Sequence, residues 1–174
     1  THEALIQDSV SYNVMGHAFF LEDGAETGNV LERNLGMLTR ASHALLTTDT
    51  SPATFWLTHP DNALRGNHAS GSDGYGFWYR LQDFPDGPSA TTAVCPKFSP
   101  LGEFSNNHAH SNRFYGLRIH PEYYPRNDPC VGFAKGSVFE QVPAVFSGLN
   151  VWKNGLKGAV ASQVGMVQFA NLTA

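Results

Sequence analysis

Phe104-Ser105-Asn106-Asn107, followed by the apolar strand Gly116-Leu117-Arg118-Ile119, is one copy of a pattern that recurs along this chain. Each copy has a short strand-like segment, an Asn, and then a Gly that opens an apolar strand. The residues that mark the copies are Asn13, Asn34, Asn67, Asn107, Asn154 and, near the end of the chain, Asn171. Their spacing varies around a base period of about 20 residues with insertions, and self-similarity on that scale is typical of a solenoid.

The repeat predicts an all-β fold, a right-handed parallel β-helix of about five to six coils with inserted loops. One coil cannot bury its inner face alone, so coils stack. An Asn at the same corner of successive coils can bond the backbone above and below it. We therefore expect the six marker Asn residues to form a structural ladder on one line. The alternative is that Asn and Gly mark ordinary turns of a β-sandwich or jelly roll.

The composition fits one folded domain. The 174 residues are 41% hydrophobic and 15% charged, with a net charge of −4. No apolar run approaches the roughly 18 residues of a membrane span, and the 11 Lys and Arg residues give no basic footprint for nucleic acid. The motifs GxxxxGK[ST], HExxH, CxxC and GxSxG are absent. We therefore expect no nucleic-acid partner, no membrane span in this segment and no metal site.

Three insertions interrupt the repeat, at residues 39–52, 82–101 and 120–133. The second and third are rich in Pro, and each leaves the repeat just after a Gly-led apolar strand. Equivalent exits from neighbouring coils should place these two loops side by side. Each of them carries one of the two Cys residues, Cys95 and Cys130.

An ordered series of segments carries a family resemblance. It opens with His17-Ala18-Phe19-Phe20-Leu21-Glu22-Asp23-Gly24 and continues with Asn34-Leu35-Gly36-Met37-Leu38-Thr39, Ala53–Leu57, Gly66–Ala69, Gly76–Tyr79 and Asn107–Asn112. In this order the segments resemble the β-helix region of the fibrocystin family. That family includes fibrocystin-like proteins, the cell migration-inducing hyaluronan-binding protein and the transmembrane cell-surface hyaluronidase.

The resemblance implies that residues 1–174 are a single β-helix segment, an internal piece of a much larger extracellular or cell-surface protein. An extracellular location is oxidising, so we expect a disulfide between Cys95 and Cys130. The implied role is structural or interactive rather than enzymatic, without a cofactor. The implied partners are other domains of the same chain, with extracellular proteins or glycans beside them. The alternative is a module that binds or hydrolyses a hyaluronan-type polysaccharide, a glycoside hydrolase in which Ca²⁺ is a candidate cofactor.

The candidate catalytic residues for that alternative are His17, Glu22, Asp23 and Asp73. Two carboxyl groups about 5–9 Å apart across a groove would be needed for glycoside hydrolysis. The competing interpretation is that Glu22-Asp23-Gly24 is a turn after a buried strand, and that His17 points inward and bonds a neighbouring coil.

The candidate binding residues are Arg33, Arg65, His68, His108 and His110. The two Arg side chains suit uronate carboxylates, although surface salt bridges with Glu32 or Asp61 compete with that role. His68 and His108 occupy the same repeat position, so their imidazoles should stack. They form either an internal polar ladder or a ligand site.

Two further expectations concern aromatic residues and glycosylation. Trp56, Trp78, Trp152 and Tyr79 are expected in the core rather than at a sugar surface. Asn171-Leu172-Thr173 is the single N-glycosylation sequon. Because Asn171 is assigned to the ladder, its amide should turn inward and carry little or no glycan.

Overall fold

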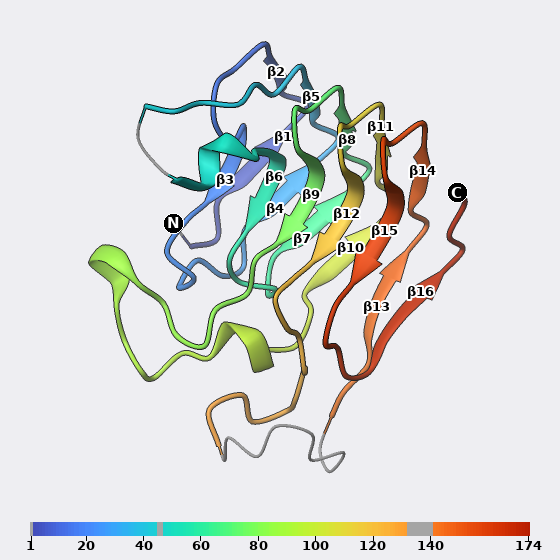
Figure 1. Ribbon diagram of the computed structural model, residues 1–174. Helices are drawn as coiled ribbons and strands as arrows, with labels where there is room; N and C mark the ends of the chain where they lie inside the picture. The colour runs from blue at the N-terminus through green and yellow to red at the C-terminus, as the bar shows by residue number, and fades with distance from the viewer. Residues whose placement is uncertain (1, 45–46, 132–140) are drawn as a thin grey trace.

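The chain folds as a parallel β-helix, shown in Figure 1. The computed structural model describes residues 2–44, 47–131 and 141–174. Within them, five coils of three strands follow one another, and one further strand begins a sixth coil. Each of the first thirteen strands pairs in parallel with the strand three places later in the chain, as between Leu31 and Leu64. The predicted fold class and coil number are therefore confirmed, and the sandwich alternative is wrong.

Three sheets form the walls of the solenoid. The first sheet contains β1 (Leu5–Gln7), β4 (Val30–Glu32), β7 (Ala63–Arg65), β10 (Glu103–Ser105), β13 (Ala144–Ser147) and β16 (Val167–Ala170). The second sheet contains β2 (Val10–Tyr12), β5 (Leu35–Met37), β8 (His68–Ser70), β11 (His108–His110) and β14 (Asn150–Trp152). The third sheet contains β3 (Phe19–Leu21), β6 (Ala53–Leu57), β9 (Tyr75–Tyr79), β12 (Tyr115–Ile119) and β15 (Lys157–Ala161). No described helix is long and apolar enough to cross a membrane.

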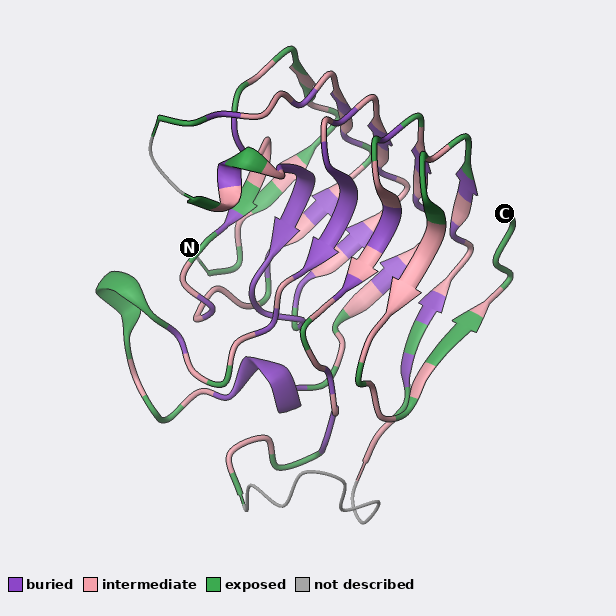
Figure 2. Cartoon of the chain, in the orientation of Figure 1, coloured by how far each residue is buried: buried purple, intermediate pink, exposed green. Residues whose placement is uncertain are grey.

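Identical positions of successive coils stack in the core. Phe19 and Phe55 stack with ring centroids 4.5 Å apart, and Phe55 and Phe77 follow at 4.7 Å. On the first sheet the matching inward column is Leu31, Leu64, Phe104 and Phe146, all at most 1% exposed. In Figure 2 the buried residues, in purple, recur from coil to coil along the strands of the three sheets. Stacked apolar side chains thus provide the hydrophobic energy that one coil lacks.

The second sheet uses small inward residues, because the start of the third-sheet strand packs against it. In the third coil Ala69 lies on the second sheet and Gly76 on the third, and a Cβ added to Gly76 would lie 2.8 Å from the Cβ of Ala109. In the second coil the larger side chain lies on the third sheet and the glycine on the second sheet. There Gly36 replaces the Ala, Thr54 replaces the Gly, and a Cβ on Gly36 would overlap the Thr54 methyl group. Each corner has room for one side chain.

Buried Asn amides join the coils at the corner between the first and second sheets. The Oδ1 atom of Asn67 accepts hydrogen bonds from the backbone N–H and the side-chain amide of Asn34, both at 3.0 Å. The Asn67 amide donates to the Leu31 carbonyl oxygen at 2.7 Å and to Asn107 Oδ1 at 3.1 Å. Asn107 continues the series by donating to the Leu64 carbonyl oxygen. This ladder satisfies backbone groups that the bend removes from the sheets.

The prediction of one line through six Asn residues is wrong for three of them. Asn154 bonds Asn112 in a second ladder, at the corner between the second and third sheets. Asn13 and Asn171 lie at exposed corner positions with φ of 54° and 53°, a left-handed conformation that Asn tolerates. The reason is that a coil has three corners, and a ladder residue and a left-handed residue are neighbours in sequence, as Asn106 and Asn107 are.

A third ladder, at the corner between the third and first sheets, was missed by the sequence interpretation. There the Asn29 amide donates to Asn62 Oδ1 at 2.9 Å. Asn62 in turn donates to the carbonyl oxygen of Glu26 at 2.9 Å. Every corner of the coil therefore has its own Asn ladder over part of its length.

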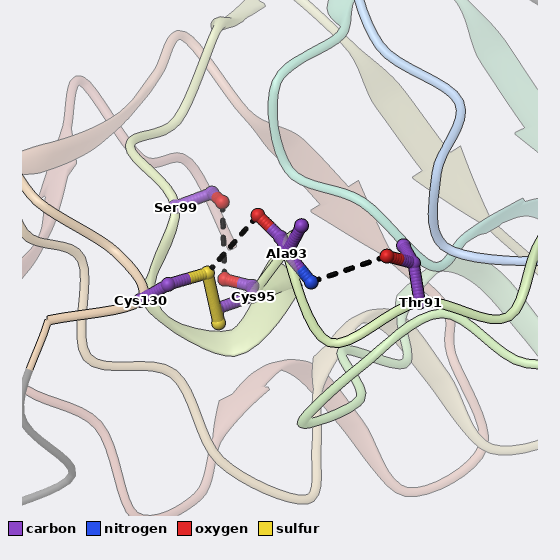
Figure 3. Close-up of a disulfide and its surroundings, with 5 residues drawn as sticks. All are labelled: Thr91, Ala93, Cys95, Ser99 and Cys130. Carbon is purple, nitrogen blue, oxygen red and sulfur yellow. Dashed lines mark hydrogen bonds between the residues drawn. A yellow bond between two sulfur atoms is a disulfide. The ribbon is translucent and has the colours of Figure 1, made fainter.

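The two Pro-rich loops lie side by side and are fastened together. Cys95 and Cys130 form a disulfide with Cα atoms 5.4 Å apart, as Figure 3 shows. The ammonium group of Lys97, whose side chain is 6% exposed, lies 2.7 Å from Asp83 and 3.6 Å from Glu122 in the other loop. The part of the 120–133 insertion beyond residue 131 lies outside the described residues. The first insertion contains the short 3₁₀ helix η1 (Thr47–Thr50), and the second contains η2 (Gly87–Ser89) and η3 (Pro96–Phe98).

Asn67→Ala tests the ladder. It removes a fully buried amide and leaves backbone groups of two coils without partners, so the free energy of unfolding should fall by about 3 kcal/mol. Asn13→Gly is the matched control at an exposed left-handed corner and should change it by less than about 0.5 kcal/mol. Urea denaturation measures both variants. Equal losses would contradict the assignment of the two corners.

Gly36→Ala tests the close packing of Gly36 on the second sheet against Thr54 on the third sheet. The added methyl group meets Thr54 and should cost about 1–3 kcal/mol of unfolding free energy. In a Thr54→Ser background the obstructing methyl is gone, while the hydroxyl that bonds Thr39 remains, so the same substitution should cost much less. A double-mutant cycle in urea measures the coupling. Additive losses would exclude this packing.

Asn171 is exposed rather than buried in a ladder, so the expectation that this sequon carries little or no glycan loses its basis. We expect the opposite outcome: expression through a secretory pathway should attach glycan to Asn171. Glycopeptide mass spectrometry measures occupancy, with Asn171→Gln as the unmodified reference. A bare Asn171 in secreted protein would show that its exposure is not sufficient.

Candidate functional site

An aromatic column runs along the outer face of the third sheet. Register places Phe20 beside Trp56, Trp56 beside Trp78, and Trp78 beside Arg118. The Trp rings lie 4.7 Å apart, and the Arg118 guanidinium lies 4.3 Å from the Trp78 ring, a cation–π contact. Because Phe55 and Leu57 point inward, strand alternation turns Trp56 outward between them.

The expected core placement of the large aromatics is therefore only partly right. Tyr79 is fully buried inside the coils. Trp56 and Trp78 are 3% and 8% exposed, but they form a separate cluster on the outer face. Trp152 is 41% exposed, because the neighbouring Val151 is buried on the inner face and strand alternation turns Trp152 outward. Alternation with the inward residues is the sequence signal that could have found this column.

His17 fastens the 39–52 loop onto this column instead of lying inside the coils. Its side chain is fully buried, with the imidazole 3.9 Å from the Trp56 ring. Nδ1 accepts a hydrogen bond from the Ala53 N–H at 3.0 Å, so Nε2 faces Thr48 at 3.4 Å and Asp49 at 3.5 Å on η1. Burial lowers the pKa of His17 to about 4 despite the Asp49 carboxylate. The imidazole is thus neutral at pH 7 and in contact with protein on all sides.

A hollow of about 170 Å³ opens beside the column. Its lining comes from β3, β6, η1 and the segment after β9: Phe20, Glu22, Thr47, Thr48, Trp56, Arg80 and Asp86. A second hollow of about 610 Å³ shares Glu22 and Asp86 with the first and adds Asp23, Glu26, Gly87 and Pro88. The sequence interpretation selected Glu22 and Asp23 but missed Arg80, which directly follows β9, and Asp86, which comes from the 82–101 insertion.

Negative charge dominates the rim of these hollows. Burial and the surrounding carboxylates of Asp23, Glu26, Asp86 and Asp49 raise the pKa of Glu22. Glu26 behaves differently. Burial opposes its ionisation, but hydrogen bonds from the backbone N–H groups of Glu22, Asp23 and Gly24 outweigh this and lower its pKa.

Asp73 does not join the other candidate catalytic residues. It lies at the corner between the second and third sheets, where it contacts Arg40 at 3.4 Å and accepts a hydrogen bond from the Ala41 N–H at 3.1 Å. The structure thus brings Glu22 and Asp23 to one hollow, buries His17 behind it, and leaves Asp73 outside the lining residues.

The candidate Arg residues are engaged in ion pairs on the first sheet. Arg33 forms a two-pronged pair with Asp8, with both distances 2.8 Å, and also contacts Glu32. Arg65 pairs with Glu103 at 2.6 Å and lies 3.7 Å from Glu32. Glu32 is the one partner that the sequence interpretation named correctly; Asp61 is not among these contacts. Both guanidinium groups are thus already paired with carboxylates of this chain, although their side chains are 53% and 41% exposed.

The candidate His residues gather on the outer face of the second sheet. The rings of His68 and His108 lie 5.4 Å apart, those of His68 and His110 4.9 Å apart, and His110 stacks on Trp152 at 4.3 Å. The alternative of an internal polar ladder is wrong, because Ala69 and Ala109 occupy the inward positions. Burial and the neighbouring imidazoles lower the pKa of His68. Among the described residues no three His, Cys, Asp or Glu side chains could hold a metal ion.

The sequence of this chain is similar to segments of several known proteins. Fibrocystin-L from Mus musculus is 45% identical over 171 residues, which are 98% of this chain and 4% of that relative. Human Fibrocystin-L is 42% identical over the same span. The human cell surface hyaluronidase CEMIP2 is 38% identical over 146 residues, which cover 68% of this chain and 10% of that protein.

The chain thus spans only a small fraction of the relatives it matches, and in Fibrocystin-L the similar region is a short segment of a very long protein. The family model described as CEMIP beta-helix matches residues 1–117. This match covers most of the first four coils, including the ladder of Asn34, Asn67 and Asn107. The chain belongs to the CEMIP beta-helix family.

Proposed function

We propose that this chain is a structural and interaction segment of a large cell-surface or secreted protein, and that it does not hydrolyse polysaccharide. The observation that carries the proposal is how the polar residues are used. The buried Asn amides and His17 fasten coils and loops to one another. The outer surface consists of sheet faces and of loops that these contacts hold in position. Such a surface suits a scaffold that binds partner proteins.

Similarity and chemistry support the same role. The chain aligns almost completely with a segment of Fibrocystin-L. Its disulfide fits an extracellular location, where such bonds persist. Other domains of the same long protein are the first expected partners, followed by extracellular proteins or glycans.

The alternative is binding or hydrolysis of a hyaluronan-type polysaccharide, as the name of one relative states for that relative. Three features weigh against it for this chain. His17 is enclosed, Arg33 and Arg65 are paired, and Glu22 stands among other carboxylates that repel a uronate polymer. A catalytic Ca²⁺ belongs only to that alternative.

The chain alone should leave high-molecular-mass hyaluronan intact. Size-exclusion chromatography of the polymer after incubation, at pH 5 and pH 7 and with or without Ca²⁺, measures its length. A commercial hyaluronidase provides the positive control, and circular dichroism verifies the fold. Depolymerisation that is lost in Glu22→Gln or Asp23→Asn, but retained in the exposed control Asp61→Asn, would overturn the proposal.

A further inference from the structure

We propose that the hollow between β3, η1 and the segment after β9 binds an uncharged pyranose sugar at the end of a neutral glycan. This goes beyond the scaffold role, which needs no ligand at this place. The hollow has an apolar wall and a polar rim, and contacts within the protein fix its lining residues in place. Each of these three features has a separate structural cause.

The apolar wall is formed mainly by Phe20, with the nearly buried Trp56 as its neighbour in register on the outer face of the third sheet. Phe20 is 37% exposed, because strand alternation turns it outward between Phe19 and Leu21. One face of a pyranose ring presents C–H groups, and aromatic rings offer such groups a large apolar surface. The wall therefore suits the side of a sugar that water solvates poorly.

The rim supplies both hydrogen-bond acceptors and donors. Glu22 and Asp86 are acceptors, Arg80 is a donor, and the hydroxyl groups of Thr47 and Thr48 serve as both. A sugar hydroxyl needs such a mixture, because it donates one hydrogen bond and accepts others. Bonds to ionised groups are the stronger kind. Small-molecule sites commonly join an apolar wall to a few convergent polar groups in this way.

Charge selects against acidic sugars. Glu22 and Asp86 face one cation, Arg80, in the first hollow, and Asp23 and Glu26 add negative charge in the adjoining one. A carboxylate or sulfate on the ligand would enter this field against repulsion. Neutral hexoses and N-acetylhexosamines meet no such penalty, so the predicted ligand class differs from hyaluronan.

The walls are held before any ligand arrives. Buried His17 fixes η1 against Trp56, and the Asp86 N–H donates to the Asp23 carbonyl oxygen at 3.0 Å. The Arg80 guanidinium lies 5.8 Å from the Trp56 ring and donates to Gln82 at 3.2 Å. Preformed walls reduce the conformational entropy that binding would otherwise cost.

Binding should be measured with cellohexaose, chitohexaose and mannohexaose as neutral probes, and with hyaluronan hexasaccharide as the charged probe. Saturation-transfer NMR and titration calorimetry on the folded chain give the affinities. At least one neutral probe should bind with a Kd of about 0.1–1 mM, and the hyaluronan hexasaccharide should bind at least about tenfold more weakly.

Variants locate the site. Glu22→Ala combined with Asp86→Ala, and separately Phe20→Ala, should weaken neutral-sugar binding by about tenfold or more. Glu3→Ala combined with Asp61→Ala removes the same charge at exposed positions outside the hollow and should leave the affinity unchanged. Circular dichroism of each variant separates loss of binding from loss of fold.

Three results would overturn the inference. The first is that no neutral probe binds at millimolar concentration. The second is equal binding by the hollow variants and their control. The third is tighter binding of the hyaluronan hexasaccharide than of every neutral probe. None of these results bears on the absence of hydrolysis, so the scaffold proposal succeeds or fails separately.

Discussion

The hydrogen bonds of the buried Asn ladder are the constraint on which the rest of this structure depends. At the corner between the first and second sheets, the Asn67 amide bonds the backbone at both Asn34 and Leu31. A bend in a stacked coil takes backbone groups out of the sheets, and burying them without partners would cost more than the apolar stacking of one residue returns. Because the ladder allows each bend to be sharp and buried, Phe55 can stack on Phe19 and Phe77 in register.

The regular interior leaves the exterior free to vary. Insertions leave at corners, and the two that carry Cys95 and Cys130 leave neighbouring coils at equivalent points. A disulfide, the ion pairs of Lys97 and backbone hydrogen bonds hold the two loops together; the Tyr124 N–H, for example, donates to the Lys97 carbonyl oxygen. This division of roles explains how one chain can combine a strictly repeating core with an irregular outer surface, and why the candidate site is found on that surface.

The hollow beside Trp56 shows how such a surface is assembled. Phe20 and Trp56 come from successive coils, Thr48 comes from the first insertion, and Asp86 comes from the second. Its rim carries the carboxyl groups of Glu22, Asp23, Glu26 and Asp86. These residues lie outside the repeating core, so similarity of the coils alone does not define a ligand.

The β-helix fold and the approximate number of coils could be predicted from the amino-acid sequence, because the Asn corners and the apolar strands recur at a spacing that is visible in the chain. The pairing of Cys95 with Cys130 was also predictable, from equivalent loop exits together with the family resemblance. Only the tertiary structure decided which corner each Asn occupies. Asn106 and Asn107 are adjacent, yet one is a left-handed corner and the other a ladder residue, and a shift of one residue cannot be resolved from spacing alone. It likewise decided that Trp152 and the three His residues face outward, and that Asp86 reaches Glu22, because an inserted loop obeys no repeat.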